Sequence, residues 1–175
     1  MKLDEIFTFE NLYDAYKQCR KSKQHKGEVI RFETNLSYNI NKLVNEIATK
    51  KYKLGKYKEF LIYEPKERLI EALPFRDRVV IRCFCDIVLR DKIEVKLIYD
   101  NTACRTEKGT LFAIKRLEKF LRHEYLKEHN NDIYFLKCDI QKYFPSIDHQ
   151  ILLDLLRKIN FSEDEMWMIE KLVKE

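Results

Sequence analysis

The sequence contains little glycine and little proline, with 3 residues of each among 175. These two residue types most often end regular elements and form tight turns. Their scarcity argues against a β-sandwich, which needs many turns between short strands. It favours long helices joined by short connections, so we expect a mainly helical chain.

The sequence also lacks the cysteine pattern of a zinc site or of a disulfide framework. The five cysteines are odd in number, and no two of them show the two-residue spacing that is typical of zinc ligands. We interpret them as reduced and mostly buried thiols. They are Cys19, Cys83, Cys85, Cys104 and Cys138.

Long apolar runs are missing as well. No stretch reaches the roughly 20 apolar residues that a membrane-spanning helix needs. The first residues do not form an apolar run followed by a cleavage site. We therefore expect no membrane partner and a cytoplasmic location.

What the sequence does contain is a balanced but slightly basic set of charges. Lysine and arginine number 34 and aspartate and glutamate 29, a formal net charge of +5, and 45% of the residues are hydrophobic. This composition predicts a folded core with a solvated surface. Basic residues cluster at 21–26, 50–58 and 115–122 and could follow a phosphate backbone, although each run alone is more typical of a solvated helix face.

Apolar residues recur at helical spacing in several segments, which predicts helices there. Thr8, Ser146 and Ser162 stand where residues that cap a helix amino terminus are expected. The predicted helices cover residues 9–16, 29–47, 74–88 with an extension or restart toward 98, 111–125 ending near 129–131, 147–156 and 163–172.

Two other segments indicate strands. Residues 57–63 and 69–73 are rich in β-forming residues and flank the charged segment 64–68, which predicts an antiparallel hairpin. Residues 133–138 are apolar and bounded by polar residues, which predicts a strand buried on at least one face. The predicted fold class is therefore α+β.

Residues 135–149 carry the most informative pattern of the chain. Asp139 follows the predicted strand, the aromatic pair Tyr143-Phe144 comes next, and Pro-Ser-Ile-Asp-His completes the pattern. Phosphoryl transfer with two divalent metal ions needs carboxylates held rigidly at such a strand end. By itself, Asp139 would be typical of a turn.

The whole pattern resembles the first catalytic palm motif of reverse transcriptases, in particular the bacterial enzymes of group II introns, diversity-generating retroelements and retrons. The resemblance implies that Asp139 is a catalytic residue and metal ligand. It implies that Ile140 contacts the second metal through its backbone carbonyl, and that Phe144 excludes a ribose 2′-hydroxyl. Without the resemblance, Phe144 would be interpreted as a core residue.

Residues 63–80 resemble the fingers hairpin of the same enzymes, although the tip here is shorter and has no glycine. The resemblance implies that Lys66 and Arg68 bind the incoming nucleotide and that Arg76 lies near the template. A point charge and a bidentate guanidinium both suit a triphosphate. Arg78 could serve the phosphate or the template in the same way. An ordinary solvated turn, and pairing of Arg76 and Arg78 with Asp77 or Glu71, are the structural alternatives.

Residues 99–110 resemble the second fingers motif of the family. The resemblance implies that Arg105 and Lys108 lie along the template path. The Lys108-Gly109-Thr110 sequence is not a phosphate-binding loop, because its order is wrong and the preceding glycine is missing.

Together these motifs imply an amino-terminal helical extension at 1–50, fingers at 51–131 and an incomplete palm at 132–175. The full enzyme would catalyse template-directed RNA-directed DNA synthesis with Mg²⁺, or Mn²⁺, an RNA template, a DNA primer and a dNTP. The family's Tyr-x-Asp-Asp motif is absent, and Tyr99-Asp100-Asn101 does not match it. We therefore expect an amino-terminal fragment that is inactive alone.

Two other functions stay open at this point. One is a noncatalytic module that binds RNA or another single strand on a fingers scaffold. The other is a helical interaction protein without a nucleic-acid role, for which Asp139 and Phe144 are structural. The exposed edge of an incomplete palm also predicts a homodimer.

Overall fold

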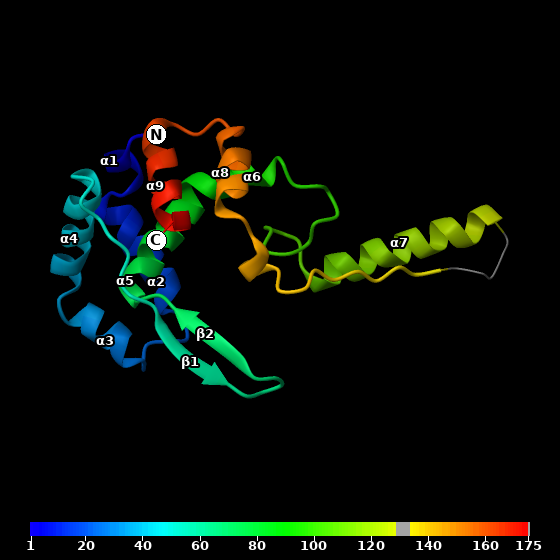
Figure 1. Ribbon diagram of the computed structural model, residues 1–175, viewed down its shortest axis with the longest axis horizontal. Helices are drawn as coiled ribbons and strands as arrows, with labels where there is room; N and C mark the ends of the chain where they lie inside the picture. Colours follow the sequence, from blue (N-terminus) through cyan, green and yellow to red (C-terminus); the bar gives the residue numbers. More distant parts are fainter. Residues whose placement is uncertain (129–133, 175) are drawn as a thin grey trace. The chain divides into compact units, whose positions relative to one another are not determined.

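A computed structural model describes residues 1–128 and 134–174. The chain divides into two compact units, Met1–Lys92 with His149–Glu175 and Ile93–Asp148, and each is described by itself. The described elements are mainly helices with one antiparallel hairpin, which confirms the predicted α+β class (Figure 1). In chain order they are α1 Leu3–Ile6, α2 Phe9–Arg20, α3 Gly27–Thr34, α4 Leu36–Ala48, β1 Lys58–Ile62, β2 Arg68–Ala72, α5 Phe75–Phe84, the π-helical η1 Cys85–Leu89, α6 Arg90–Glu94, α7 Thr110–Glu128, the 3₁₀ turn η2 Phe144–Ser146, α8 His149–Arg157 and α9 Glu163–Lys174.

Two of the three predicted helix caps are confirmed. The Thr8 hydroxyl accepts a hydrogen bond from the Asn11 backbone N–H at 3.2 Å, at the start of α2. The Ser162 hydroxyl accepts one from the Glu165 N–H at 3.3 Å, and the Glu165 carboxylate accepts one from the Ser162 N–H at 2.7 Å. This reciprocal pair is a capping box at the start of α9.

The third predicted cap is wrong. Helix α8 begins at His149 rather than directly after Ser146. The Ser146 hydroxyl instead donates to the Tyr143 carbonyl at 2.8 Å within η2. The local turn around Pro145 uses the side chain that a helix start would have needed.

The predicted continuous helix over 29–47 is interrupted at Asn35, where the backbone adopts φ −128° and ψ 49° between α3 and α4. The Asn39 amide donates to the Phe32 carbonyl at 2.9 Å and so satisfies a carbonyl that the interruption leaves unpaired. The apolar periodicity continues across the break because α3 and α4 each bury their apolar residues in the core.

The predicted strand over 133–138 is wrong for the residues that the structure describes. Ile133 and the predicted helix end at 129–131 lie outside the described residues. Residues 134–140 have no regular structure, and Tyr134 and Leu136 are 91% and 90% exposed. The physical reason is the lack of a partner, because the described sheet consists of β1 and β2 alone.

The core of the first unit lies between α2, α4 and α5. Tyr16 on α2, Phe32 on α3 and Phe75 on α5 form an aromatic cluster, in which the Phe32 and Phe75 rings meet edge to face at 5.4 Å. Phe7 stacks on Phe84 at 6.1 Å. Rings of this size supply a large part of the apolar area that folding buries.

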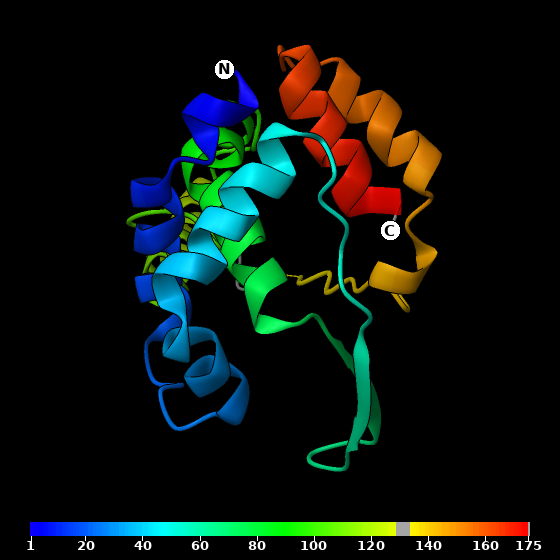
Figure 2. The ribbon, with the colours of Figure 1, turned by 90° about the vertical axis from the view of Figure 1, so that its left-hand side faces the viewer.

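The predicted hairpin is confirmed, and its register pairs Phe60 with Ile70 and Ile62 with Arg68. Figure 2 shows the hairpin extending away from the helices, with its turn at the far end. Both strands are mostly exposed, so the hairpin depends on its attachment to the helices rather than on a core of its own.

That attachment is a buried carboxylate. Asp77, in the first turn of α5, is fully buried and accepts hydrogen bonds from the Tyr52 hydroxyl at 2.8 Å and the Gly55 backbone N–H at 3.0 Å. Tyr52 and Gly55 precede β1, whereas Asp77 follows β2. The carboxylate therefore fixes both ends of the hairpin to α5.

A second buried carboxylate, Glu165 on α9, joins distant parts of the same unit. It accepts hydrogen bonds from the Lys92 ammonium at 2.6 Å and from the Met1 amino group at 3.1 Å. Burial by itself would raise the pKa of Glu165. The hydrogen bonds from Lys92, Met1 and Ser162 lower the pKa by more than burial raises it, so it lies below its ordinary value. The ionised form is the one that holds the contacts.

Gly55→Ala is expected to destabilise the protein. An added Cβ would lie 2.7 Å from the Pro74 ring and 2.9 Å from the Asp77 carboxylate, and neither group can move without breaking the attachment. Urea unfolding should show a loss of about 1–3 kcal/mol. Gly109→Ala is the matched control, because its Cβ meets nothing within 4 Å, and it should change stability by less than about 1 kcal/mol. Equal effects of the two changes would contradict this account of the attachment.

Glu165→Gln should reduce stability most at neutral pH. Because the folded-state pKa is lowered, the stabilisation is present above the unfolded-state pKa and is lost as pH falls through the folded-state value. The difference between wild type and variant in unfolding free energy should therefore narrow below about pH 4.5. Glu163→Gln, at an exposed position in the same turn, serves as the control. A difference that does not vary with pH would contradict the prediction.

Candidate nucleotide and nucleic-acid interface

The hairpin tip carries two exposed cations. Lys66 lies in the connection between the strands, and Arg68 opens β2 opposite Ile62. Neither side chain forms a hydrogen bond or ion pair with the residues that the structure describes. Both charges are therefore available to a ligand, but an ordinary solvated turn would look the same, so nucleotide binding by these residues stays a prediction.

Arg76, the third cation of this region, is already paired. Its guanidinium donates to the Glu46 carboxylate at 2.7 Å, lies 3.3 Å from Asp77 and rests 5.5 Å from the centre of the Tyr52 ring. Of the two structural alternatives, the pairing with Asp77 is present. A role of Arg76 in template binding stays a prediction.

Arg105 and Lys108, in the second unit, hold their own loop. Arg105 donates to the Ile98 carbonyl at 3.0 Å and lies 3.3 Å from the Glu94 carboxylate. Lys108 donates to the Tyr99 carbonyl, and its ammonium lies 4.1 Å from the centre of that ring. These contacts fix the segment before α7, and template contact by these two residues also stays a prediction.

A further pair, which the sequence did not single out, closes the same loop. Arg116 on α7 forms a bidentate ion pair with Asp100, one contact measuring 3.0 Å, and lies 5.1 Å from the centre of the Tyr99 ring. The hydrogen bond from Arg116 lowers the pKa of the Asp100 carboxyl. Asp100 therefore helps to hold this loop.

The residues of the proposed palm motif lie in an exposed segment of the second unit. Asp139 and Ile140 are exposed, and Phe144, at the start of η2, is 81% exposed. The Phe144 ring meets the Tyr143 ring edge to face at 5.2 Å. Phe144 is therefore not the core residue that the sequence alone would indicate.

These residues supply only part of a metal site. Asp139 offers one carboxylate and Ile140 one carbonyl, whereas Mg²⁺ requires about six oxygen ligands. Among the described residues, no three His, Cys, Asp or Glu side chains are grouped to hold a metal ion. The described side chains therefore do not form a complete Mg²⁺ site.

Lys66 and Arg68 belong to the first unit, and Asp139, Phe144, Arg105 and Lys108 belong to the second. The cations of the hairpin tip therefore belong to one unit, and the two loop-holding cations and the palm-motif residues belong to the other. The structure does not place the one group relative to the other.

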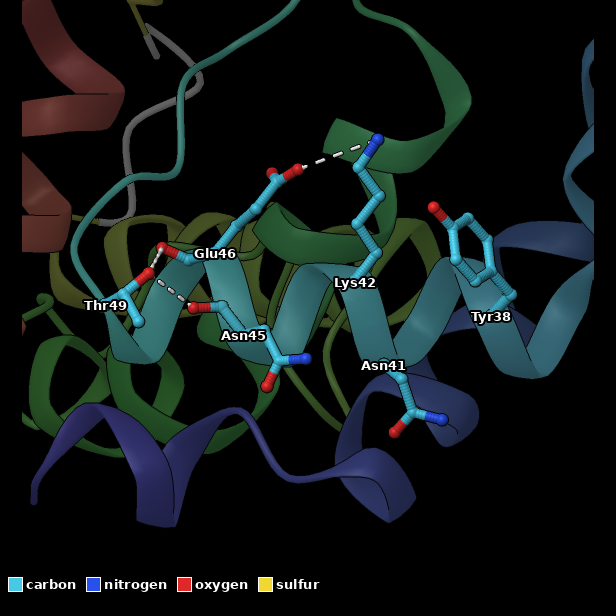
Figure 3. Close-up of a pocket in the computed structure, with 6 residues that line it drawn as sticks. All are labelled: Tyr38, Asn41, Lys42, Asn45, Glu46 and Thr49. Carbon is cyan, nitrogen blue, oxygen red and sulfur yellow. Dashed lines mark hydrogen bonds and ion pairs between the residues drawn. The ribbon is translucent and has the colours of Figure 1, made fainter.

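One surface hollow of about 380 Å³ lies along α4. Figure 3 shows that its side chains come from α4 and from Thr49 directly after it, with Lys42 directed toward Glu46. The Lys42 ammonium lies 4.0 Å from the Glu46 carboxylate. The Thr49 hydroxyl donates to the Asn45 carbonyl at 2.7 Å. The only cation that lines this hollow faces a carboxylate, so the hollow offers no unpaired charge to an anion.

A second hollow of about 310 Å³ lies at the base of the hairpin. Arg31 and Lys58 line it, and neither has an ion pair or hydrogen bond with the described residues. The sequence contained a signal for Lys58, which belongs to the basic run 50–58, but none for Arg31. The hollow is lined by Glu28, Arg31, Phe32, Asn39, Lys58, Pro74, Phe75 and Arg76.

The five cysteines are less buried than expected. Cys83 is buried, Cys19 and Cys85 are partly buried, and Cys104 and Cys138 are exposed. Burial raises the pKa of the Cys83 thiol to about 12. The expectation of mostly buried thiols is wrong because Cys138 lies in the segment that does not form a strand.

No protein-family model matches the chain, and no curated protein matches it. Within the part of the chain that the structure describes, no helix is long and apolar enough to cross a membrane.

Cys138 should react rapidly with iodoacetamide in the folded protein, and Cys83 should be protected, because one thiol is exposed and the other is buried with a raised pKa. Mass spectrometry of the peptides after timed alkylation measures both rates, and Cys104 is the exposed control. Protection of Cys138 comparable to that of Cys83 would contradict the exposed segment and favour the buried strand.

Proposed function

We propose that the chain forms the fingers and the first palm segment of a reverse transcriptase, an RNA-directed DNA polymerase of the bacterial retroelement type. Three motifs support the proposal, because they occur in the family's order over residues 63–80, 99–110 and 135–149. The full enzyme would join dNTPs to a DNA primer on an RNA template. A cytoplasmic location belongs to the same proposal.

The observation that carries the proposal is the unpaired state of Lys66 and Arg68. Most other arginines of the hairpin base and the loop are neutralised by carboxylates, whereas these two stand at the end of a hairpin that Asp77 fixes at its base. A triphosphate needs cations that are free to contact it and a base that positions them. The hairpin supplies both.

Asp139 and Phe144 have the roles that the resemblance gives them. Asp139 would bind Mg²⁺ or Mn²⁺ together with Ile140 and phosphate oxygens, and Phe144 would lie against the sugar. The two protein ligands do not complete a metal site, so no catalytic step is derived through the ion. Because no Tyr-x-Asp-Asp sequence occurs in these 175 residues, we expect them to bind substrate but not to polymerise alone.

A noncatalytic RNA-binding module is the second candidate. It is favoured by the exposed Asp139, which has no grouped carboxylates among the described residues, and by the unpaired Arg31 and Lys58. It requires no metal ion. Self-association through the exposed apolar residues 134–136 is compatible with either candidate.

Lys66→Ala is expected to weaken binding of a fluorescent dNTP analogue about 10-fold, because it removes one charge-assisted contact with the phosphates. Asp139→Asn should weaken binding only when Mg²⁺ is present, because it removes a metal ligand. Fluorescence titration with and without Mg²⁺ measures both effects. Lys158→Ala removes an exposed lysine that has no ion pair with the described residues, and it should leave affinity unchanged.

Binding that does not depend on Mg²⁺ or on Asp139, but is weakened by Lys66→Ala, would support the noncatalytic module. Binding that neither Lys66→Ala nor Asp139→Asn weakens would contradict the polymerase proposal. Circular dichroism of each variant confirms that the comparison is made between folded proteins.

A further inference from the structure

The hollow at the hairpin base holds two positive charges that form no ion pair with the described residues. Helix α3 contributes Arg31 and strand β1 contributes Lys58. The other charged residues of the lining are paired, since Glu28 binds Arg78 and Arg76 binds Glu46 at 2.7 Å. The hollow therefore has an excess of two positive charges, which favours an anionic ligand.

Its floor is apolar and firmly held. Phe32 and Phe75 meet edge to face at 5.4 Å, and Pro74 lies beside them. The floor belongs to the aromatic core cluster, so it does not need to reorganise when a ligand arrives. An apolar floor below two unpaired cations suits a ligand that alternates charged and uncharged groups.

The hollow is continuous with one face of the hairpin. Lys58, Phe60 and Ile62 alternate along β1 and share a face, and Arg68 joins it because it pairs with Ile62. Lys58 lines the hollow, and about 13 Å of strand separates it from Ile62 at about 3.3 Å per residue. Phe60, 50% exposed, lies between the two cations.

We propose that Arg31, Lys58 and Phe60, here called the basic strip, bind single-stranded RNA through its phosphodiester backbone and one base. One phosphate occupies the hollow between Arg31 and Lys58, and a base stacks on Phe60. The inference rests on the proposed function for the choice of RNA. The hollow on α4 does not compete, because its lysine faces Glu46.

The test is fluorescence anisotropy of a short fluorescein-labelled single-stranded RNA over a series of KCl concentrations. The variant Arg31→Gln/Lys58→Gln should bind on the order of 10-fold more weakly at low salt. The slope of log affinity against log salt should become shallower by about 0.7, because the variant no longer neutralises the one phosphate in the hollow.

A control variant, Lys51→Gln/Lys158→Gln, removes the same two charges from exposed positions outside the hollow. It should keep the wild-type affinity and slope. Phe60→Ala should weaken binding at every salt concentration without changing the slope, because a stacked base carries no counterion. Each single variant, Arg31→Gln and Lys58→Gln, should show about half of the change in slope.

If Arg31→Gln/Lys58→Gln and Lys51→Gln/Lys158→Gln weakened RNA binding equally, the proposal would be overturned, because net charge alone would then explain binding. RNA binding that Arg31→Gln/Lys58→Gln leaves unchanged would also overturn the proposal, but it would not count against the Mg²⁺-dependent nucleotide site. Binding of nucleotide without any binding of RNA would overturn the basic strip alone. Loss of Mg²⁺-dependent nucleotide binding with the strip still functional would instead overturn the polymerase proposal.

Discussion

The buried carboxylate of Asp77 is the constraint on which the first unit depends. An ionised carboxylate is expensive to remove from water unless hydrogen bonds and an opposite charge replace the lost solvation. Asp77 takes them from the Tyr52 hydroxyl, the Gly55 N–H and the neighbouring Arg76. Arg76 in turn binds Glu46, so α4, α5 and both ends of the hairpin are joined through one network. The same network raises the pKa of Tyr52, first through burial and then through the adjacent negative charge.

This constraint divides the basic residues by role. Arg76, Arg105, Lys108 and Arg116 are engaged with carboxylates, carbonyls or aromatic rings, and their contacts hold local structure. Several cations have no ion pair with the described residues, and four of them lie on the hairpin or beside its base. They are Lys66, Arg68, Lys58 and Arg31. A hairpin that is firmly attached at its base and carries unpaired cations suits phosphate recognition, because the cations are positioned before the ligand arrives.

The sequence predicted correctly those elements that depend on residues close together in the chain. The capping side chains of Thr8 and Ser162, and the β-rich runs around the charged turn, act within a few residues and were predicted from sequence. The strand over 133–138 was not, because a strand requires a partner that the described chain does not provide. The network around Asp77 joins residues 22 and 25 positions apart, so spacing alone could not predict it. Nor could spacing predict that Glu28 pairs with Arg78, 50 positions away, rather than with the nearby Arg31. The roles of Asp139 and Phe144 rest on the resemblance.

The central claim is that the hairpin and its base are the phosphate-binding element of this chain. Hydrogen–deuterium exchange, measured by mass spectrometry with and without saturating single-stranded RNA, tests it directly. The account predicts slower exchange in peptides that cover 58–72 and 27–34, and unchanged exchange in the peptide that covers 40–48. Protection confined to 40–48, or no protection of the hairpin at saturation, would contradict the claim.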